Sequence, residues 1–299
     1  MAPATNNALG RIQSALRQPP SGPAHMVPFI PAGFGGYETT AATLRAVAEA
    51  GASVIEVGIP FSDPIADGPV IQSAYQAALD GGTTVEGIFQ CIQEVREQVR
   101  VPMLAMVSYS LVFRGGGDRT IIGGVELFCR RARHAGFDGL LCPDLPPPEA
   151  QAFCAVAKQH GLEPVLLVAP TTSASRRSEI GQLAGGFIYY LSVAGVTGER
   201  VTLPPELVGG VSDMRRRTEL PICVGFGIGR AEQVRSLSGV ADGAIVGSAY
   251  VRRMQEGMPG GSEKVSRLCG QFTHELLGHA VAEGVGSDAG GIGGASSCR

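Results

Sequence analysis

Short apolar runs alternate along the chain with longer stretches in which apolar residues recur every three or four positions. Several of the runs are almost continuous in Val, Ile and Leu, which is typical of parallel strands covered on both faces. The eight strand-like runs lie at 27–32, 53–57, 101–107, 139–142, 163–168, 187–191, 222–225 and 243–246. The helical stretches lie between them, at 40–49, 70–79, 84–97, 126–135, 148–160, 175–184, 205–217 and 231–237. This alternation predicts an α/β fold, a single (β/α)8 TIM barrel, with an open parallel sheet as the alternative.

Apolar spacing predicts one extra helix at each end of the barrel. Before the first strand, Leu9, Ile12 and Leu16 form a stripe that predicts an N-terminal helix capping the barrel bottom. A C-terminal extra helix on the outside is predicted by Val265, Leu268, Phe272 and Leu276. We therefore expect an N-terminal helix and linker over 1–24, a catalytic barrel over 25–283, and a Gly/Ser-rich disordered tail over 284–299.

Two local patterns refine this prediction. Thr83 and Glu86 have the spacing of a capping box, which would start the helix that follows them. Glycines at 115–117 and 123–124 flank a stretch after the third strand, where they predict a loop.

Composition excludes several classes of protein. The net charge of −3 offers nucleic acid no broad basic face, and the apolar stretch 101–113 is too short to cross a bilayer. The N-terminus has no basic start followed by an apolar segment, and the 7 cysteines are scattered without a C-x-x-C motif. Together these features favour the cytoplasm and argue against a zinc site or a disulfide framework.

Lysine usage argues against Schiff-base chemistry. The only lysines are Lys158 and Lys264, and both lie in polar helical segments rather than at the end of an apolar run. A Schiff base needs a desolvated lysine in the pocket, so lysine-imine aldolases and pyridoxal phosphate enzymes are poor interpretations of this chain.

The second strand carries the most informative residue. Glu56 interrupts an apolar run, where an unpaired charge would be costly, so its pKa should lie above the ordinary value and it could act as a general acid. The alternative is a structural glutamate paired with an arginine. Asp67 follows in a proline-rich loop, as a second carboxylate that stays ionised or, alternatively, as the N-cap of the next helix.

Glycine-rich turns follow the last two strands, at 225–229 and 246–249. Glycine lets backbone amides approach an anion closely, and the loops after strands seven and eight form the usual phosphate site of this fold. Small residues over 192–200, after strand six, suggest a lid over the ligand, with an ordinary surface loop as the alternative. None of the 5 histidines lies in these loops, so a histidine-based metal site or triad is not expected.

The segment 56–69, EVGIPFSDPIADGP, resembles the signature of the tryptophan synthase alpha chain family, and the resemblance extends from about residue 8 to the last helix. Supporting matches are PDLP at 143–146, AGVTG at 194–198 and GFGI at 225–228. The sequence departs from the family pattern at Ser108-Tyr109-Ser110, where members commonly carry Tyr and Asn, and at 31–36.

The resemblance implies retro-aldol cleavage of indole-3-glycerol phosphate to indole and glyceraldehyde 3-phosphate, in the last steps of tryptophan biosynthesis. Glu56 would then protonate indole C3, and ionised Asp67 would accept a hydrogen bond from the indole N–H. The further substrate-binding positions implied are Phe29, Ile71, Tyr189, Thr197, Gly198, Phe226, Gly227, Gly247 and Ser248.

The resemblance also implies a partner. Members of the family work with a beta chain, commonly as an alpha2-beta2 heterotetramer, and that chain carries the pyridoxal phosphate. No metal or cofactor is expected on this chain. Two alternatives remain: a standalone lyase that releases free indole, and a non-catalytic regulatory barrel.

Overall fold

The computed structural model describes residues 10–64, 67–114, 121–192, 203–225 and 227–279. Its strands form a closed parallel barrel in chain order, in which β1 pairs with both β2 and β8. The strands are β1 (His25–Pro31), β2 (Ile55–Gly58), β3 (Met103–Met106), β4 (Gly139–Leu141), β5 (Glu163–Val168), β6 (Ile188–Leu191), β7 (Ile222–Gly225) and β8 (Gly243–Val246). The predicted TIM barrel is confirmed, and the open sheet is wrong.

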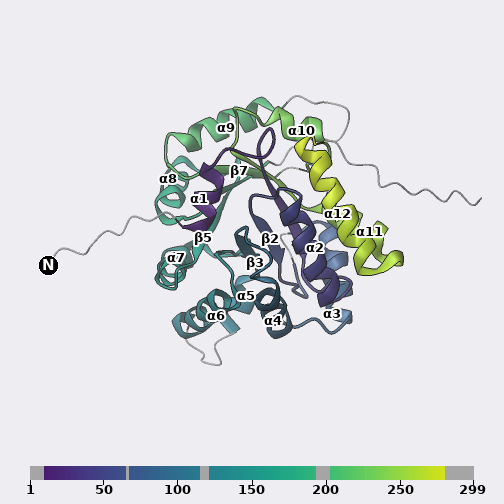
Figure 1. Ribbon diagram of the computed structural model, residues 1–299. Coiled ribbons are helices and arrows are strands. Elements are labelled where there is room, and N and C mark those ends of the chain that lie inside the picture. The colour runs from purple at the N-terminus through teal and green to yellow at the C-terminus, as the bar shows by residue number, and fades with distance from the viewer. Residues whose placement is uncertain (1–9, 65–66, 115–120, 193–202, 226, 280–299) are drawn as a thin grey trace, which may run out of the picture.

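Helices surround the barrel (Figure 1). They are α1 (Arg11–Arg17), α2 (Tyr37–Glu49), α3 (Pro69–Asp80), α4 (Val85–Val95), α5 (Tyr109–Arg114), α6 (Ile121–Ala135), α7 (Ala150–Gln159), α8 (Ala174–Leu183), α9 (Pro205–Arg215), α10 (Ala231–Ser236), α11 (Ser248–Gly257) and α12 (Gly261–Leu277). Two 3-10 turns, Pro147–Glu149 and Met258–Gly260, precede α7 and α12.

Local chemistry explains several helix starts. Proline occupies the first turn of α3 and α9, where its missing N–H costs nothing. Ser173 caps α8 by accepting from the amide of Arg176. At α4 the capping residue is Thr84, whose hydroxyl accepts from the amide of Gly87 at 3.1 Å. The capping box predicted from Thr83 is therefore wrong by one position.

The described residues on either side of 115–120 are helical, whereas the predicted glycines at 115–117 lie outside the described residues. α5 follows β3 directly, and α6 begins at Ile121, before the glycines at 123–124 that we expected to flank a loop. A Cβ on Gly124 would lie 2.1 Å from the carbonyl oxygen of Phe113. This glycine therefore permits close packing of α6 on α5 instead of ending a helix.

The predicted bottom helix is confirmed as α1. Figure 1 shows α1 within the ring formed by the outer helices. Its amides at Ile12 and Gln13 donate to the two carboxylate oxygens of Glu163, at 2.7 and 3.0 Å, at the start of β5. Arg11 also reaches Asp138, just before β4, at 3.2 Å. Because these contacts lie at the amino ends of the strands, α1 closes the end of the barrel opposite the site described below.

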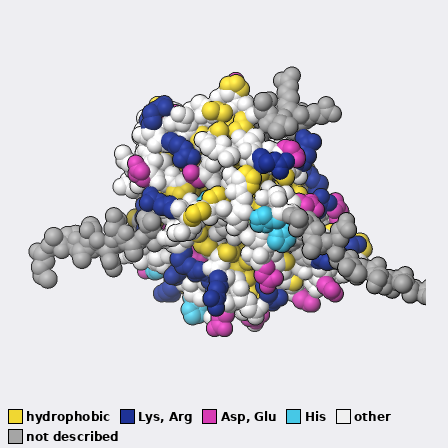
Figure 2. Space-filling model, turned by 45° about the horizontal axis from the view of Figure 1, so that its top comes forward, with side chains coloured by type: hydrophobic (Ala, Val, Ile, Leu, Met, Phe, Trp, Pro, Cys, Tyr) yellow, Lys and Arg dark blue, Asp and Glu magenta, His cyan; other side chains and the backbone are white. Residues whose placement is uncertain are grey.

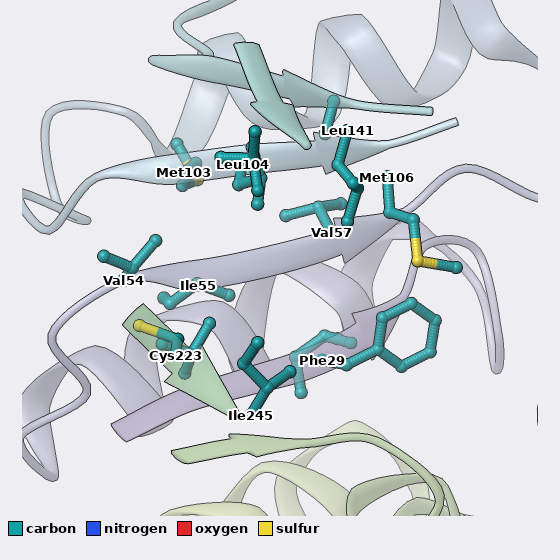
Figure 3. Packing of buried hydrophobic residues seen from close by; sticks show 14 of the residues in the cluster. Phe29, Val54, Ile55, Val57, Met103, Leu104, Met106, Leu141, Cys223 and Ile245 are labelled. Atoms are coloured by element: carbon teal, nitrogen blue, oxygen red, sulfur yellow. The ribbon is translucent and has the colours of Figure 1, made fainter. Parts of the chain in front are cut away.

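The core fills the barrel and the layer beneath the helices. Side chains from β1, β2, β3, β4, β7 and β8 meet there, with Phe29 and Met106 toward the same end of the barrel (Figure 3). The predicted C-terminal helix, α12, packs against α2 and α11 and buries Val265, Phe272 and Leu276.

Acidic and basic side chains are mixed on the surface, in keeping with the small net charge of the sequence. On the face seen in Figure 2, basic side chains are interspersed with acidic ones. Within the described ranges, no helix is long and apolar enough to span a membrane. The 6 cysteines in those ranges, Cys91, Cys129, Cys142, Cys154, Cys223 and Cys269, are buried and free.

Candidate active site

Glu56 lies on β2 among the apolar residues of the barrel. Its register partners are Phe29 on β1 and Leu104 on β3. Only 1% of the residue is exposed, and its Oε1 has no hydrogen-bond partner among the described residues. No arginine pairs with it in that part of the chain, so the structural interpretation of Glu56 is not supported.

Burial controls the protonation of Glu56. Loss of solvent, followed by the negative charge of Asp67, raises the pKa of Glu56 to about 8. The carboxyl is therefore mostly protonated at neutral pH, as a general acid requires.

Asp67 lies in the loop between β2 and α3 and is half-buried. The N-cap of α3 is Gly68, with no side-chain cap, so the alternative in which Asp67 caps the helix is wrong. Burial and then the charge of Asp144 raise the pKa of Asp67 to about 6. Asp67 is thus mostly ionised at neutral pH, although it is easier to protonate than we expected from its loop.

A pocket lies at the carboxyl ends of β2, β3 and β4. It is lined by Ile59, Phe61, Asp63, Pro64, Asp67, Tyr75, Met106, Val107, Ser108, Pro143 and Asp144. Most of this lining is apolar, with a few convergent polar groups, as in typical small-molecule sites. Asp67 is in the wall, whereas Glu56 lies behind it in the barrel.

The unusual Ser108-Tyr109 pair has a structural role at this pocket. The hydroxyl of Ser108 and the amide of Tyr109 both donate to the carboxylate of Asp144, each at 2.7 Å. The loop after β3 is therefore held to the loop after β4. The same Asp144 carboxylate faces Asp67 closely enough to raise its pKa.

Three of the predicted substrate-binding positions come together beside Glu56. A Cβ placed on Gly247 would lie 3.6 Å from Cδ1 of Ile71 and 4.0 Å from Cβ of Phe29. A fourth position, Tyr189 on β6, lies against Gly225 of the neighbouring strand. Burial, and then the charges of Glu56 and Asp67, raise the pKa of Tyr189, so this ring is close to both carboxyls.

The two glycine-rich turns differ in what they offer an anion. Gly247 precedes α11, which begins at Ser248, and a helix start favours an anion, although the amides of Tyr250 and Val251 already donate to the carbonyl of Gly247. After β7, Gly227 has a φ of +67°, a conformation that favours glycine. The amides of Gly229 and Arg230 already donate to the side-chain oxygen of Gln233, so they are occupied. The predicted sites Thr197, Gly198 and Phe226 lie outside the described residues.

Sequence reasoning missed Tyr75, which lines the pocket and is 2% exposed. It follows Ile71 by four residues on α3, so both share one helix face. The four-residue spacing from Ile71 could have indicated that Tyr75 faces the site, but the same spacing is equally typical of an ordinary core tyrosine. Among the described residues, no cluster of three or more His, Cys, Asp or Glu could hold a metal ion.

The fold and the site define a (β/α)8-barrel enzyme with two carboxyls of raised pKa near the strand ends. A family model described as tryptophan synthase alpha chain matches residues 17–276. The chain therefore belongs to the tryptophan synthase alpha chain family.

Relatives and solved structures agree with this assignment. The chain is 41% identical over 261 residues to the tryptophan synthase alpha chain of Rhodopirellula baltica, covering 84% of this chain and 91% of that one. It is 42% identical over 252 residues to that of Synechococcus sp., covering 84% and 90%. A solved alpha-subunit from Pyrococcus furiosus superposes with a TM-score of 0.76 at 33% identity, covering 86% of this chain and 98% of that one.

Proposed function

We propose that this chain cleaves indole-3-glycerol phosphate to indole and glyceraldehyde 3-phosphate, as the alpha subunit of a tryptophan synthase. The observation that carries the proposal is the buried Glu56, whose Oε1 has no hydrogen-bond partner in the described part of the chain, with Asp67 close by. Two carboxyls with different pKa values supply an acid and an anion in one site.

Glu56 has two tasks in this reaction. As a neutral acid it gives its proton to indole C3, which leaves a positively charged ring. As the resulting carboxylate it takes the proton of the hydroxyl on the adjacent carbon. The O–H pair then forms the aldehyde C=O, the C–C pair returns to the ring, and Glu56 is protonated again.

Asp67 stabilises the charge that develops between these steps. Its carboxylate accepts a hydrogen bond from the indole N–H, where positive charge grows once C3 is protonated. The pKa of about 6 leaves Asp67 mostly anionic at neutral pH. We assign to Thr197, in the segment after β6, the role of orienting this carboxylate.

The remaining predicted residues hold the two ends of the substrate. Phe29, Ile71, Tyr189 and Phe226 would surround the indole ring. Gly198, Gly227, Gly247 and Ser248 would hold the phosphate through amides and a hydroxyl, helped by the start of α11. The closeness of Gly247 to Ile71 and Phe29 supports a substrate that spans both groups.

We also propose the assembly and setting of the protein. The partner is a tryptophan synthase beta chain in an alpha2-beta2 heterotetramer, and pyridoxal phosphate belongs to that chain. This chain needs no cofactor of its own and acts in the cytoplasm. Its catalytic unit is the barrel over 25–283, preceded by the helix and linker over 1–24 and followed by a tail over 284–299.

The test measures indole release from indole-3-glycerol phosphate, with and without a beta chain. Glu56→Gln should lower the single-turnover rate by at least about 10²-fold, because the general acid is lost. Asp67→Asn should also lower it strongly. Asp80→Asn is the control, since this exposed carboxyl ends α3 away from the pocket.

Each outcome has a distinct meaning. Full cleavage by Glu56→Gln would remove Glu56 from the mechanism. High turnover of the parent with no gain and no co-elution on adding a beta chain would favour the standalone lyase. Activation of a beta chain without any cleavage would favour the non-catalytic barrel.

A further inference from the structure

Tyr75 presents an unsatisfied hydroxyl beside the two carboxyls. The residue is 2% exposed, and its hydroxyl has no hydrogen-bond partner among the described residues. Buried tyrosine hydroxyls normally find a partner, because leaving one unpaired costs free energy. The missing partner therefore needs an explanation.

The packing of α3 fixes where this hydroxyl points. A Cβ on Gly58 would lie 2.5 Å from the Tyr75 oxygen, and Gly58 follows Glu56 by two residues on β2. The ring meets Phe29 edge-on, with 6.2 Å between the ring centres. Tyr75 also lines the pocket together with Asp67. Its hydroxyl thus lies between the pocket and the strand that carries Glu56.

The two unpaired groups have complementary chemistry. Burial, and then the charges of Asp67 and Glu56, raise the pKa of Tyr75, so the phenol keeps its proton and can donate. Within the described ranges Glu56 Oε1 is also without a partner, so neither group satisfies the other. A hydroxyl group of a ligand can satisfy both, by accepting from Tyr75 and donating to the Glu56 carboxylate.

We propose that Tyr75 is a further catalytic residue of the lyase reaction, whose hydroxyl donates a hydrogen bond to the substrate hydroxyl that becomes the aldehyde. This inference rests on the proposed function. The donor stabilises the negative charge that builds on this oxygen while Glu56 removes its proton. Tyr75 itself keeps its proton throughout, so the proton balance of the reaction does not change.

The test compares Tyr75→Phe with Tyr190→Phe. Tyr190 is a matched control because it is fully buried, its hydroxyl also lacks a partner among the described residues, and it lies against Gly210 of α9 instead of the pocket. Tyr75→Phe should lower kcat/KM for indole release by about 10- to 100-fold. This range reaches up to the usual effect of losing one hydrogen-bond donor to a developing oxyanion. Tyr190→Phe should stay within about twofold of the parent.

Binding separates a catalytic role from a packing role. We expect Tyr75→Phe to bind an indole alkyl phosphate that lacks the glycerol hydroxyls as tightly as the parent does. Loss of that binding, or a kcat/KM within twofold of the parent, would overturn the proposal. Thermal unfolding of both variants is measured alongside, and equal melting temperatures are expected.

Failure of the proposed function gives a different result. If Glu56→Gln cleaves the substrate normally, or the parent does not cleave it at all, the proposed function is wrong, and the inference about Tyr75 fails with it. If the parent is active and Glu56→Gln inactive while Tyr75→Phe is unchanged, only the inference about Tyr75 is wrong.

Discussion

At the scale of single residues, the pKa values of the two carboxyls define the pH range of activity. The proposed mechanism needs Asp67 ionised and Glu56 protonated. We expect kcat/KM for indole release to fall below about pH 6 as Asp67 gains a proton, and above about pH 8 as Glu56 loses one. A rate profile from pH 5 to pH 9 checks this, and a flat profile would contradict it.

The same burial of Glu56 has a cost in stability. Its pKa rises from 4.5 to about 8, so the folded state holds a proton that the unfolded state releases within that range. Stability from this group is therefore complete below about pH 4.5 and is lost as the pH rises toward 8, at about 1.4 kcal/mol per pH unit.

Glu56→Gln should remove this dependence on pH, because glutamine does not ionise. We expect the variant to exceed the parent in free energy of unfolding at pH 8.5 and to match it more closely at pH 5. Urea unfolding at both pH values measures the difference. A variant that is less stable than the parent at pH 8.5 would contradict the expectation.

Individual residues also show where sequence reasoning stops. Glu56 could be predicted as a candidate because burying a carboxylate within an apolar strand costs free energy, so a structural role alone seldom accounts for it. Tyr75 could not, because whether a buried phenol has a partner depends on groups from β1 and β2 that only the fold brings together. The pKa of Asp67 likewise depends on Asp144, which follows another strand.

At the scale of elements, the start of α4 offers a clean test of capping. Thr84→Ala should lower the free energy of unfolding by about 1 kcal/mol, because the amide of Gly87 loses its acceptor. Thr84→Ser keeps the hydroxyl and should restore most of the loss. Urea unfolding of the three proteins checks this, and equal loss in both variants would show that the hydroxyl is not responsible.

The elements themselves were largely predictable, for a physical reason. Strands β5, β7 and β8 have the predicted bounds, because buried parallel strands need continuous apolar runs that end sharply at turns. The α5 helix and the early start of α6 could not be predicted, because glycine at 124 reads locally as a breaker. Gly124 lies inside α6 because the carbonyl oxygen of Phe113 leaves no room for a side chain there.

At the scale of the whole molecule, Glu163 joins α1 to the barrel. Glu163→Ala removes the acceptor of two backbone amides, so we expect about 2–4 kcal/mol lower stability. Glu163→Gln keeps one good acceptor and should lose less. Glu179→Ala, which breaks only a surface ion pair with Arg176, should change the stability by less than about 1 kcal/mol.

Urea unfolding, together with indole release, measures these effects. Because Glu163 lies at the end of the barrel opposite the pocket, the folded Glu163→Ala protein should cleave its substrate at the parental rate. A loss of activity without a loss of stability would mean that the two ends of the barrel are coupled.

The contact between α1 and Glu163 also bears on the order in which the chain folds. The amide of Ile12 and its acceptor are 151 residues apart, and β1 must wait for β8 to complete its pairing. A nascent chain therefore carries the apolar stripe of Ile12 and Leu16 exposed to water until β5 has left the ribosome. The bottom of the barrel can therefore close only after β5 has been synthesised, and translation arrested before residue 163 leaves this apolar stripe uncovered.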